Sequence, residues 1–279
     1  MAYDTYKVIK VEVRGKVAYG TIDNPPINVI TAPLLDELVR LSTQLEADKD
    51  LLVFVLRSAN PDFFIAHFDV AAILEFPTDK PPRYEDYANG FYHDMCERFR
   101  LMDKVTIAQI EGRVGGGGSE LSMSFDMRFG VRGKTFVNQM EVPLGILPGG
   151  TGTQRMPRLI GRNRAMEVIL GGIDMDADTA ERWGYLNRAF EPGQIAPYVE
   201  WLSHRIASFP AEAVRLTKQA INSADKPLAD GLRDESYLFA QLIRTESGKR
   251  NMRKFLQMGG QTRDVELKIQ DANGMLGGV

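Results

Sequence analysis

Four consecutive glycines, Gly115–Gly118, constrain this chain most, because they lie between a strand-like stretch, 105–110, and a helix-like stretch, 119–125. Glycine lets the backbone approach a ligand closely and adopt dihedral angles that other residues avoid. The first N–H groups of a helix have no partner inside it, so they can stabilise an electron-rich oxygen. Glu120 follows Gly117 by three residues, which predicts a carboxylate on the same side of the helix as that N–H. Backbone donors beside a carboxylate favour acyl chemistry through an enolate.

The remaining pattern alternates strands with helices. Residues 6–22 predict a β-hairpin that turns at Arg14-Gly15-Lys16, and apolar residues at helical spacing predict a helix over 32–47. Further strands are expected at 51–56, 105–110, 127–131 and 185–190, and further helices at 69–75, 84–102, 155–170 and 177–183. From residue 195 only helices are expected, at 195–207, 211–224, 228–247 and 249–258, before a frayed end at 273–279. This order indicates an α/β core domain, 1–194, with a C-terminal α-helical appendage, 195–279.

Composition argues against several classes of protein. The net charge of -3 argues against a nucleic-acid partner. No apolar run approaches the roughly 18 residues of a membrane span, and no basic region followed by an apolar one predicts a secretory signal. The single cysteine, Cys96, excludes an intramolecular disulfide and a cysteine-rich metal site, and it fits a reducing, cytoplasmic compartment. With only three histidines and no metal-ligand spacing, we expect no bound metal.

Four segments, in order along the chain, resemble the crotonase family, also called the enoyl-CoA hydratase/isomerase family. Any one glycine motif would be a weak signal, whereas four in order at nearly the family's spacing are specific. The segments are Asp23-Asn24-Pro25-Pro26-Ile27-Asn28, Phe64-Ile65-Ala66-His67-Phe68-Asp69, Gly116-Gly117-Gly118-Ser119-Glu120 followed by Asp126, and Gln139-Met140-Glu141 through Leu144 to Arg155.

The resemblance implies the crotonase (ClpP-like) fold, a spiral of ββα repeats that assembles as a homotrimer or a dimer of trimers. It implies an acyl-CoA substrate, and no cofactor apart from the coenzyme A that the substrate carries. We therefore expect residues 195–279 to serve oligomerisation, and we expect neither a nucleic-acid nor a membrane partner.

The resemblance also assigns the site. Two backbone N–H groups, those of Ala66 and Gly117, are expected to form an oxyanion hole for the thioester carbonyl. The two catalytic carboxylates of the hydratases match Glu120 and Glu141. Further substrate contacts are expected from His67, Phe68, Asp69 and Gly116.

These residue types suit the hydration of a 2-enoyl thioester, which builds negative charge on the thioester oxygen. We expect Glu120 to activate water for attack at C3 and Glu141 to deliver a proton to C2, although two close carboxylates can share these roles. The prediction is a lyase, an enoyl-CoA hydratase-like enzyme of fatty acid metabolism. An enoyl-CoA isomerase, an acyl-CoA hydrolase and a non-catalytic protein of the same fold remain alternatives.

Two positions need separate interpretation. His67 stands where the family has glycine, so the turn beside Ala66 can differ, and the imidazole can narrow the acyl pocket or act as an acid or base. Gly149, Gly150 and Gly152 resemble a phosphate loop, but no Gly-Lys-Ser/Thr sequence follows. We expect these glycines to shape the loop beside the active site.

Overall fold

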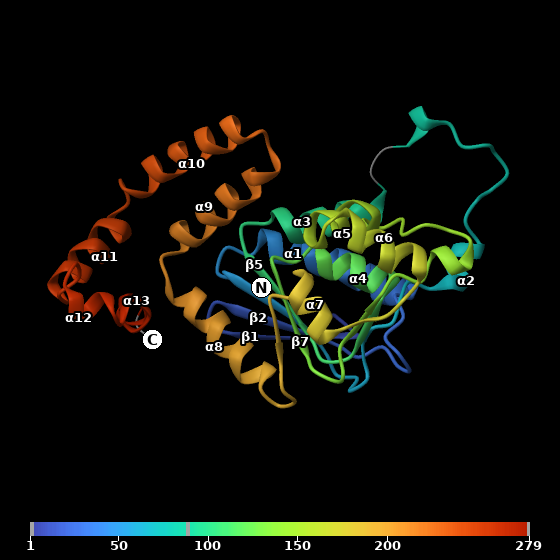
Figure 1. The fold of residues 1–279 in the computed structure, drawn as a ribbon, viewed down its shortest axis with the longest axis horizontal. Coiled ribbons are helices and arrows are strands. Elements are labelled where there is room, and N and C mark those ends of the chain that lie inside the picture. The colour runs from blue at the N-terminus through green and yellow to red at the C-terminus, as the bar shows by residue number, and fades with distance from the viewer. Residues whose placement is uncertain (1–2, 88–89, 278–279) are drawn as a thin grey trace.

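A computed structural model describes residues 3–87 and 90–277 of the chain, and it shows two packed sheets wrapped by helices (Figure 1). The larger sheet holds, in spatial order, β1 (Ile9–Arg14), β2 (Val17–Ile22), β3 (Val53–Ser58), β5 (Val105–Ile110), β7 (Met127–Val131) and β10 (Arg188–Phe190). The smaller sheet holds β4 (Phe63–Ile65), β6 (Arg113–Gly115), β8 (Phe136–Asn138) and β9 (Met175–Asp176).

Successive strands alternate between the two sheets, so that β3, β5 and β7 lie in the larger sheet while β4, β6 and β8 lie in the smaller one. The strands from β2 to β10 of the larger sheet pair in parallel, and such pairing needs crossover connections. The connections contain α1 (Ala32–Ala47), α2 (Val70–Leu74), α3 (Phe91–Leu101) and α4 (Gly116–Met123). Each turn of chain therefore adds one strand to each sheet, which is the arrangement expected of a spiral of ββα repeats.

The strands β2, β3 and β5 of the larger sheet are buried on both faces, which explains why they are largely apolar. Phe54 and Leu56 of β3 belong to the core cluster that also holds the buried leucines of α1. The alternating residues Val53 and Val55 belong to a second cluster beneath α8 (Ile195–Ser208). The first helix of the predicted C-terminal region thus packs directly on the sheet as part of the core.

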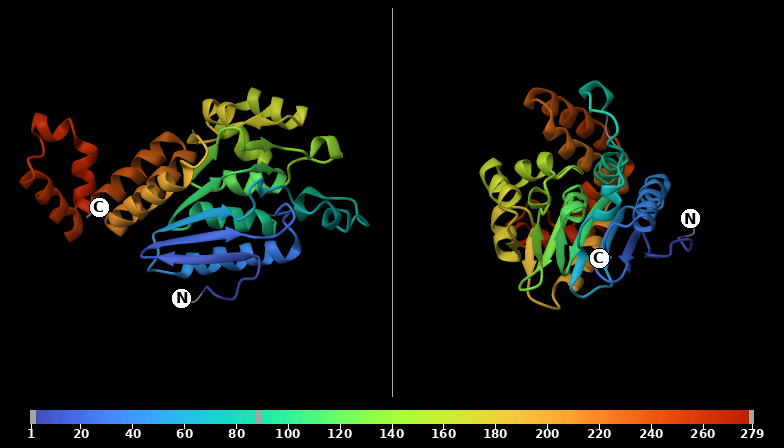
Figure 2. Two further views of the ribbon diagram at one scale, coloured as in Figure 1. Left: turned by 90° about the horizontal axis from the view of Figure 1, so that it is seen from below. Right: turned by 90° about the vertical axis from the view of Figure 1, so that its right-hand side faces the viewer.

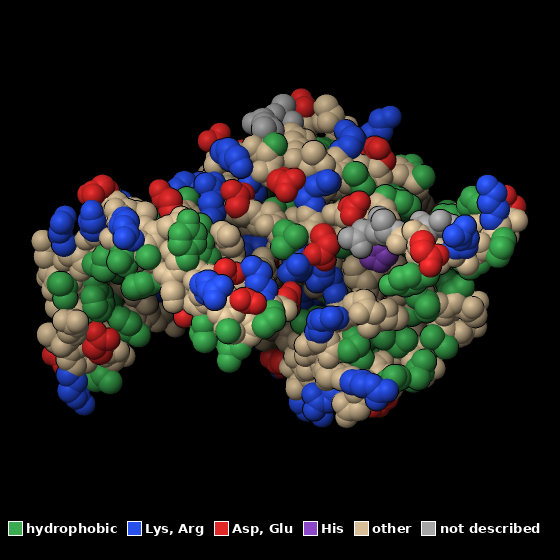
Figure 3. Space-filling model, turned by 90° about the horizontal axis from the view of Figure 1, so that it is seen from above, with side chains coloured by type: hydrophobic (Ala, Val, Ile, Leu, Met, Phe, Trp, Pro, Cys, Tyr) green, Lys and Arg blue, Asp and Glu red, His purple; other side chains and the backbone are tan. Residues whose placement is uncertain are grey.

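The remaining helices follow the core and then leave it. They are α5 (Gly152–Ile160), α6 (Arg162–Gly171), α7 (Ala177–Trp183), α9 (Ala211–Asn222), α10 (Leu228–Leu242), α11 (Glu246–Gln257), α12 (Arg263–Glu266) and α13 (Ile269–Gly277), with 3₁₀ turns η1 (Tyr84–Asp86), η2 (Val142–Leu144) and η3 (Ser223–Asp225). Helices α10 to α13 extend away from the sheets (Figures 1 and 2). Hydrophobic side chains gather on the lobe that these helices form (Figure 3). In the described ranges, no helix combines the length and apolarity that crossing a bilayer requires.

Most long elements lie where the sequence predicts them. The hairpin pairs Arg14 with Val17 around the expected turn, and the helix over 32–47 has the expected bounds. The helix predicted over 155–170 is instead two helices, because Gly161 adopts φ 85° between them. The helix predicted over 84–102 is η1 followed by α3, and residues 88–89 of that prediction lie outside the described part of the chain. The end expected to fray is helical as far as residue 277.

Candidate active site

A cavity of about 390 Å³ lies where the segment after β4, α3, the start of α4 and the loop before α5 meet. Both predicted catalytic carboxylates, Glu120 and Glu141, line this cavity, together with Gly117. The rest of its wall is mainly apolar and includes His67, Phe68, Ile73, Phe91, Tyr92, Met140 and Leu144. The structure therefore brings the glutamate pair and the glycine run together inside an apolar pocket, as an acyl-binding site requires.

Two backbone N–H groups that line this cavity, those of Gly117 and Phe68, have no acceptor among the described residues. Gly117 is the second residue of α4, so its N–H has no partner within the helix. The Phe68 N–H belongs to the peptide group whose carbonyl, that of His67, accepts the Ile30 N–H at 2.8 Å. Because C=O and N–H of a trans peptide point in opposite directions, the Phe68 N–H points away from Ile30. A Cβ built on Gly117 would lie 3.2 Å from the Phe68 Cβ, so the two residues are in contact.

The N–H of Ala66, predicted to be the second backbone donor, is not free. The Ala66 N–H donates to the carbonyl of Ile27 at 3.3 Å, and Ala66 does not line the cavity formed by the described residues. The free N–H that faces Gly117 is that of Phe68, two residues later. Histidine in place of the family's glycine at residue 67 leaves the Phe68 N–H free. The His67 ring itself donates from Nδ1 to the Phe68 carbonyl at 2.8 Å.

The Glu120 carboxylate is held by the loop before α5. Its Oε1 accepts the N–H groups of Gly150 at 2.8 Å and Gly152 at 2.7 Å, so one oxygen is fixed and the other is left for a ligand. Burial raises the pKa of Glu120, and the N–H groups of Gly152 and Gly150 oppose this rise. Between them, Thr151 adopts φ 141°, which is unusual for a β-branched residue, while its hydroxyl donates to the Glu120 carbonyl at 3.2 Å. The sequence predicted a structural loop here but not these two donors.

Glu141 lies in a different electrostatic situation. It is buried just before η2, and its Oε2 has no hydrogen-bond partner among the described residues. Burial raises the pKa of Glu141 to about 7, and the negative charge of Glu120 adds to the rise. Near neutral pH Glu141 is therefore divided between an acid that can donate a proton and a carboxylate, whereas Glu120 is bound by two N–H donors.

The other predicted contacts divide into two groups. His67 and Phe68 line the cavity, as expected. Asp69 does not, because its carboxylate accepts the Ala71 N–H at 3.0 Å as the N-cap of α2. Gly116 also lies behind the wall of the described cavity, with φ 46°, and a Cβ there would lie 3.0 Å from Glu141 Oε1. Its contribution is conformational, because a side chain would be strained and would crowd that carboxylate.

One residue near the donors could not be identified from the sequence. Tyr92, on α3, lines the cavity, and its hydroxyl donates to the Gly117 carbonyl at 2.6 Å. Its ring packs edge-on against Phe68 with ring centroids 5.9 Å apart. Tyr92 therefore contacts both residues that supply the free N–H groups. Its only sequence signal is a place in an aromatic-rich segment, which does not distinguish it from core residues.

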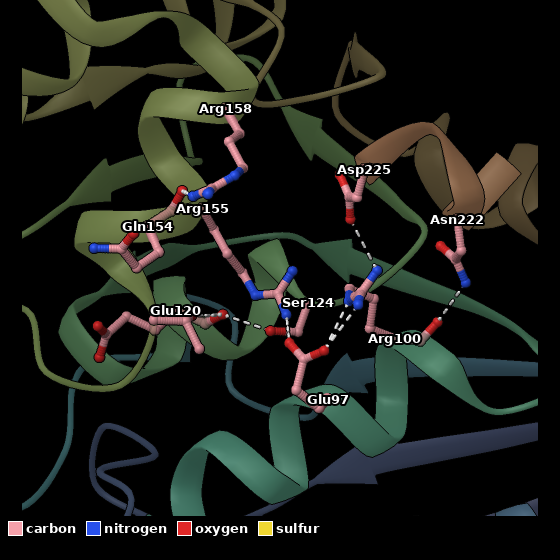
Figure 4. A network of polar contacts seen from close by, with 10 residues as sticks. Glu97, Arg100, Glu120, Ser124, Gln154, Arg155, Arg158, Asn222 and Asp225 are labelled. Atoms are coloured by element: carbon pink, nitrogen blue, oxygen red, sulfur yellow. Dashed lines mark hydrogen bonds and ion pairs between the residues drawn. The ribbon is translucent and has the colours of Figure 1, made fainter. Parts of the chain in front are cut away.

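A polar network anchors α5, the helix that begins at Gly152, whose N–H binds the Glu120 carboxylate (Figure 4). Arg155 of α5 pairs with Glu97 of α3, and Glu97 pairs with Arg100 at 2.9 Å. Arg100 in turn pairs with Asp225 of η3 at 3.2 Å. The network thus fixes α5 against α3 and connects both to the base of the C-terminal helices.

We expect Gly150→Ala to lower turnover strongly, because a Cβ at residue 150 would lie 2.5 Å from Glu120 Oε2 and 2.8 Å from the Tyr92 ring. The carboxylate or the ring must then move, and a displacement of about 1 Å can cost roughly 10²-fold in rate. Steady-state kinetics with an enoyl-CoA measures this effect. Gly149→Ala is the matched control, because its Cβ would meet nothing closer than 3.8 Å. Equal activity of the two variants would contradict this account of the loop.

A second cavity, of about 710 Å³, lies between α9 and the end of the larger sheet, and its charged groups are already engaged in ion pairs or, for Arg128, in hydrogen bonds to the carbonyls of Tyr185 and Phe125. Asp126 pairs with Lys218 at 2.8 Å and Arg100 pairs with Asp225 at 3.2 Å. In the first cavity, by contrast, Glu141 Oε2 has no hydrogen-bond partner among the described residues. Across residues 3–87 and 90–277, no group of three or more His, Cys, Asp or Glu side chains is arranged to hold a metal ion.

Comparison with known proteins gives consistent matches over most of the chain. A family model described as enoyl-CoA hydratase/isomerase matches residues 12–261. The short-chain-enoyl-CoA hydratase of Clostridium acetobutylicum is 33% identical over 248 residues, which are 88% of this chain and 93% of that protein. The crotonyl-CoA hydratase of Syntrophomonas wolfei is 29% identical over 254 residues, which are 90% of this chain and 96% of that protein. The solved enoyl-CoA hydratase from Bacillus anthracis matches with a TM-score of 0.82 at 27% identity, covering 90% of this chain and 97% of that one.

Proposed function

Because this chain belongs to the enoyl-CoA hydratase/isomerase family and has its crotonase fold, we propose that it is a lyase that adds water to a 2-enoyl-CoA thioester. One observation carries the proposal: two N–H groups that have no acceptor in the described part of the chain and two buried carboxylates line the same apolar cavity. This combination supplies a place for a developing oxyanion beside groups that can move protons.

The N–H groups of Phe68 and Gly117 bind the thioester oxygen. When water adds at C3, the electrons of the double bond move through C2 to this oxygen and form an enolate. Both donors are fixed before the reaction, since one belongs to a helix terminus and the other to a peptide group held by Ile30. They therefore stabilise the charge without reorganisation.

Glu120 takes a proton from the attacking water as its oxygen bonds to C3. Glu141 then donates a proton to C2, and the enolate returns to a thioester. The net change is the addition of one water molecule, and before the next turnover Glu120 loses the proton it gained and Glu141 regains one, by direct transfer between them or by exchange with solvent. His67 and Phe68 contact the acyl group as part of the pocket wall, where the imidazole narrows the available space.

We expect kcat/KM to have a bell-shaped dependence on pH, since this constant reports groups of the free enzyme. The proton-donating form of Glu141 is lost as pH rises through about 7, so kcat/KM falls above that value. The raised pKa of Glu120 makes its base form disappear as pH falls, which produces the acidic limb. Initial rates across the pH range check this; a profile that stays flat through neutral pH would contradict the role of Glu141.

Mass analysis of the product separates the proposed reaction from its alternatives. Hydration of crotonyl-CoA adds one water, isomerisation of an enoyl-CoA leaves the mass unchanged, and hydrolysis releases free coenzyme A. We expect the first result, with the loss of the absorbance of the conjugated thioester. A purified protein that binds acyl-CoA but gives none of these products would favour a non-catalytic role.

We further propose that the protein acts in the cytoplasm, uses no cofactor besides the coenzyme A of its substrate, and assembles as a trimer or a dimer of trimers. The helical region, residues 195–279, supports assembly: α10 exposes Leu232, Tyr237 and Phe239, which are 52%, 66% and 63% exposed in the single chain. A second copy of the chain would bury these side chains. Light scattering measures the mass of the assembly directly.

A further inference from the structure

Gln139 lies directly behind the backbone donor of Gly117. The residue follows β8, and its side chain is fully buried, with 0% exposure. In the orientation that satisfies both ends of its carboxamide, the NH₂ group donates to the carbonyls of Gly116 and Asn138, each at 3.2 Å. The side-chain amide also lies against the loop that holds Glu120, since a Cβ on Gly152 would be 2.7 Å from it.

The Gly116 carbonyl and the Gly117 N–H belong to one peptide group, and they point in opposite directions. A hydrogen bond from Gln139 to the carbonyl therefore directs the N–H toward the opposite side, where Phe68 contacts Gly117. It also polarises the peptide group, because hydrogen bonds in a chain strengthen one another by about 10–30% per bond. Gly116 adopts φ 46°, which glycine reaches without steric cost, and the hydrogen bond from Gln139 helps to select this orientation of the peptide.

The peptide group that carries the Phe68 N–H is also held by a hydrogen bond to its carbonyl, but from a different kind of donor. The carbonyl of the peptide that carries the Phe68 N–H is that of His67, and it accepts the Ile30 N–H at 2.8 Å. A main-chain donor thus supports one side of the anion-binding pair. On the other side the supporting donor is a side chain, which can be removed by mutation.

We propose that Gln139 is a positioning residue that aims and polarises the Gly117 N–H toward the thioester oxygen. This inference rests on the proposed function, because it concerns the carbonyl of a bound acyl-CoA. It assigns Gln139 no contact with the substrate, since the residue does not line the described cavity. Its removal should act on the developing oxyanion more than on the binding of the substrate.

The test uses the full-length variants Gln139→Leu and Gln139→Met, whose side chains are similar in size to glutamine but cannot donate a hydrogen bond. The matched control is Thr135→Val, which removes a different buried donor. The Thr135 hydroxyl donates to the Ile110 carbonyl at 2.6 Å, and neither residue lines the described cavity. Thermal unfolding measures the effect of each change on stability. Infrared spectra of bound butanoyl-CoA, labelled with ¹³C at the carbonyl, measure how strongly the site polarises the thioester without any turnover.

In the wild-type protein we expect the bound carbonyl band at lower wavenumber than in solution. Both Gln139 variants should lose part of this shift and lower kcat roughly tenfold, less than the ~10²–10³ for complete loss of an oxyanion donor. KM should stay within about twofold, and Thr135→Val should keep the wild-type band even where it loses stability. Variants that fold, bind butanoyl-CoA and retain the full wild-type shift would overturn the inference. A wild-type band at the solution position would instead overturn the proposed oxyanion hole itself.

Discussion

Replacing Glu120 by glutamine is expected to lower kcat for enoyl-CoA hydration by roughly 10²–10⁴-fold, the range over which general acid–base groups contribute. The amide oxygen of glutamine can still accept the N–H groups of Gly150 and Gly152, so the side chain should keep its position. It can no longer take a proton from water. We therefore expect KM to change little while kcat falls, measured by the loss of the absorbance of the conjugated thioester.

The companion change, Glu141→Gln, separates the two carboxylates by their pH dependence. It should also lower kcat strongly, and the decline of kcat/KM above pH 7 should disappear with the group whose pKa is about 7. A useful control is Glu12→Gln, because Glu12 lies on β1 and pairs with Arg14 at 2.9 Å, away from the cavity. Wild-type activity in both the Glu120 and the Glu141 variant would contradict the two-carboxylate mechanism.

The second large effect concerns the main chain at Phe68. Replacing this residue by the corresponding α-hydroxy acid converts its amide to an ester and removes only the N–H. We expect kcat to fall by ~10²–10³, as for the loss of other oxyanion donors. The side chain stays in place, so packing against Tyr92 and the shape of the cavity should persist. Steady-state kinetics and acyl-CoA binding, measured together, check this result.

The same replacement at Ala66 is the matched control. Its N–H is engaged by Ile27 at 3.3 Å, so an ester there should reduce stability modestly and leave kcat near the wild-type value. If the ester at residue 66 abolished turnover while the ester at 68 did not, the donor would belong to Ala66 and our assignment to Phe68 would be wrong.

Whether the N–H of Ala66 or that of Phe68 is free could not be predicted from the sequence. The family resemblance of the sequence placed the segment from Phe64 to Asp69 beside the glycine run, and in the structure Phe68 contacts Gly117. Which N–H stays free depends on how this segment meets Ile27 and Ile30, which lie far away in the sequence. The six residues from Phe64 to Asp69 alone do not contain the information about these contacts.

Among the strands, too, some could be predicted from the sequence and others could not. The strands at 105–110 and 127–131 were predicted with their observed bounds, because each is a short, mainly apolar stretch that the sheet buries. The strands β6, β8 and β9 were not predicted, since each has only two or three residues and exists through pairing with distant segments. The glutamate pair could be predicted from motifs, whereas the loop donors to Glu120 and the support from Gln139 required coordinates.

The proposed mechanism depends most directly on where the thioester oxygen binds, and a crystal structure with butanoyl-CoA measures this. We predict that the carbonyl oxygen lies about 2.7–3.1 Å from both the Phe68 and the Gly117 nitrogen, with C2 and C3 facing the two glutamates. An acyl group bound elsewhere, or a carbonyl oxygen that points away from these two nitrogens, would contradict it.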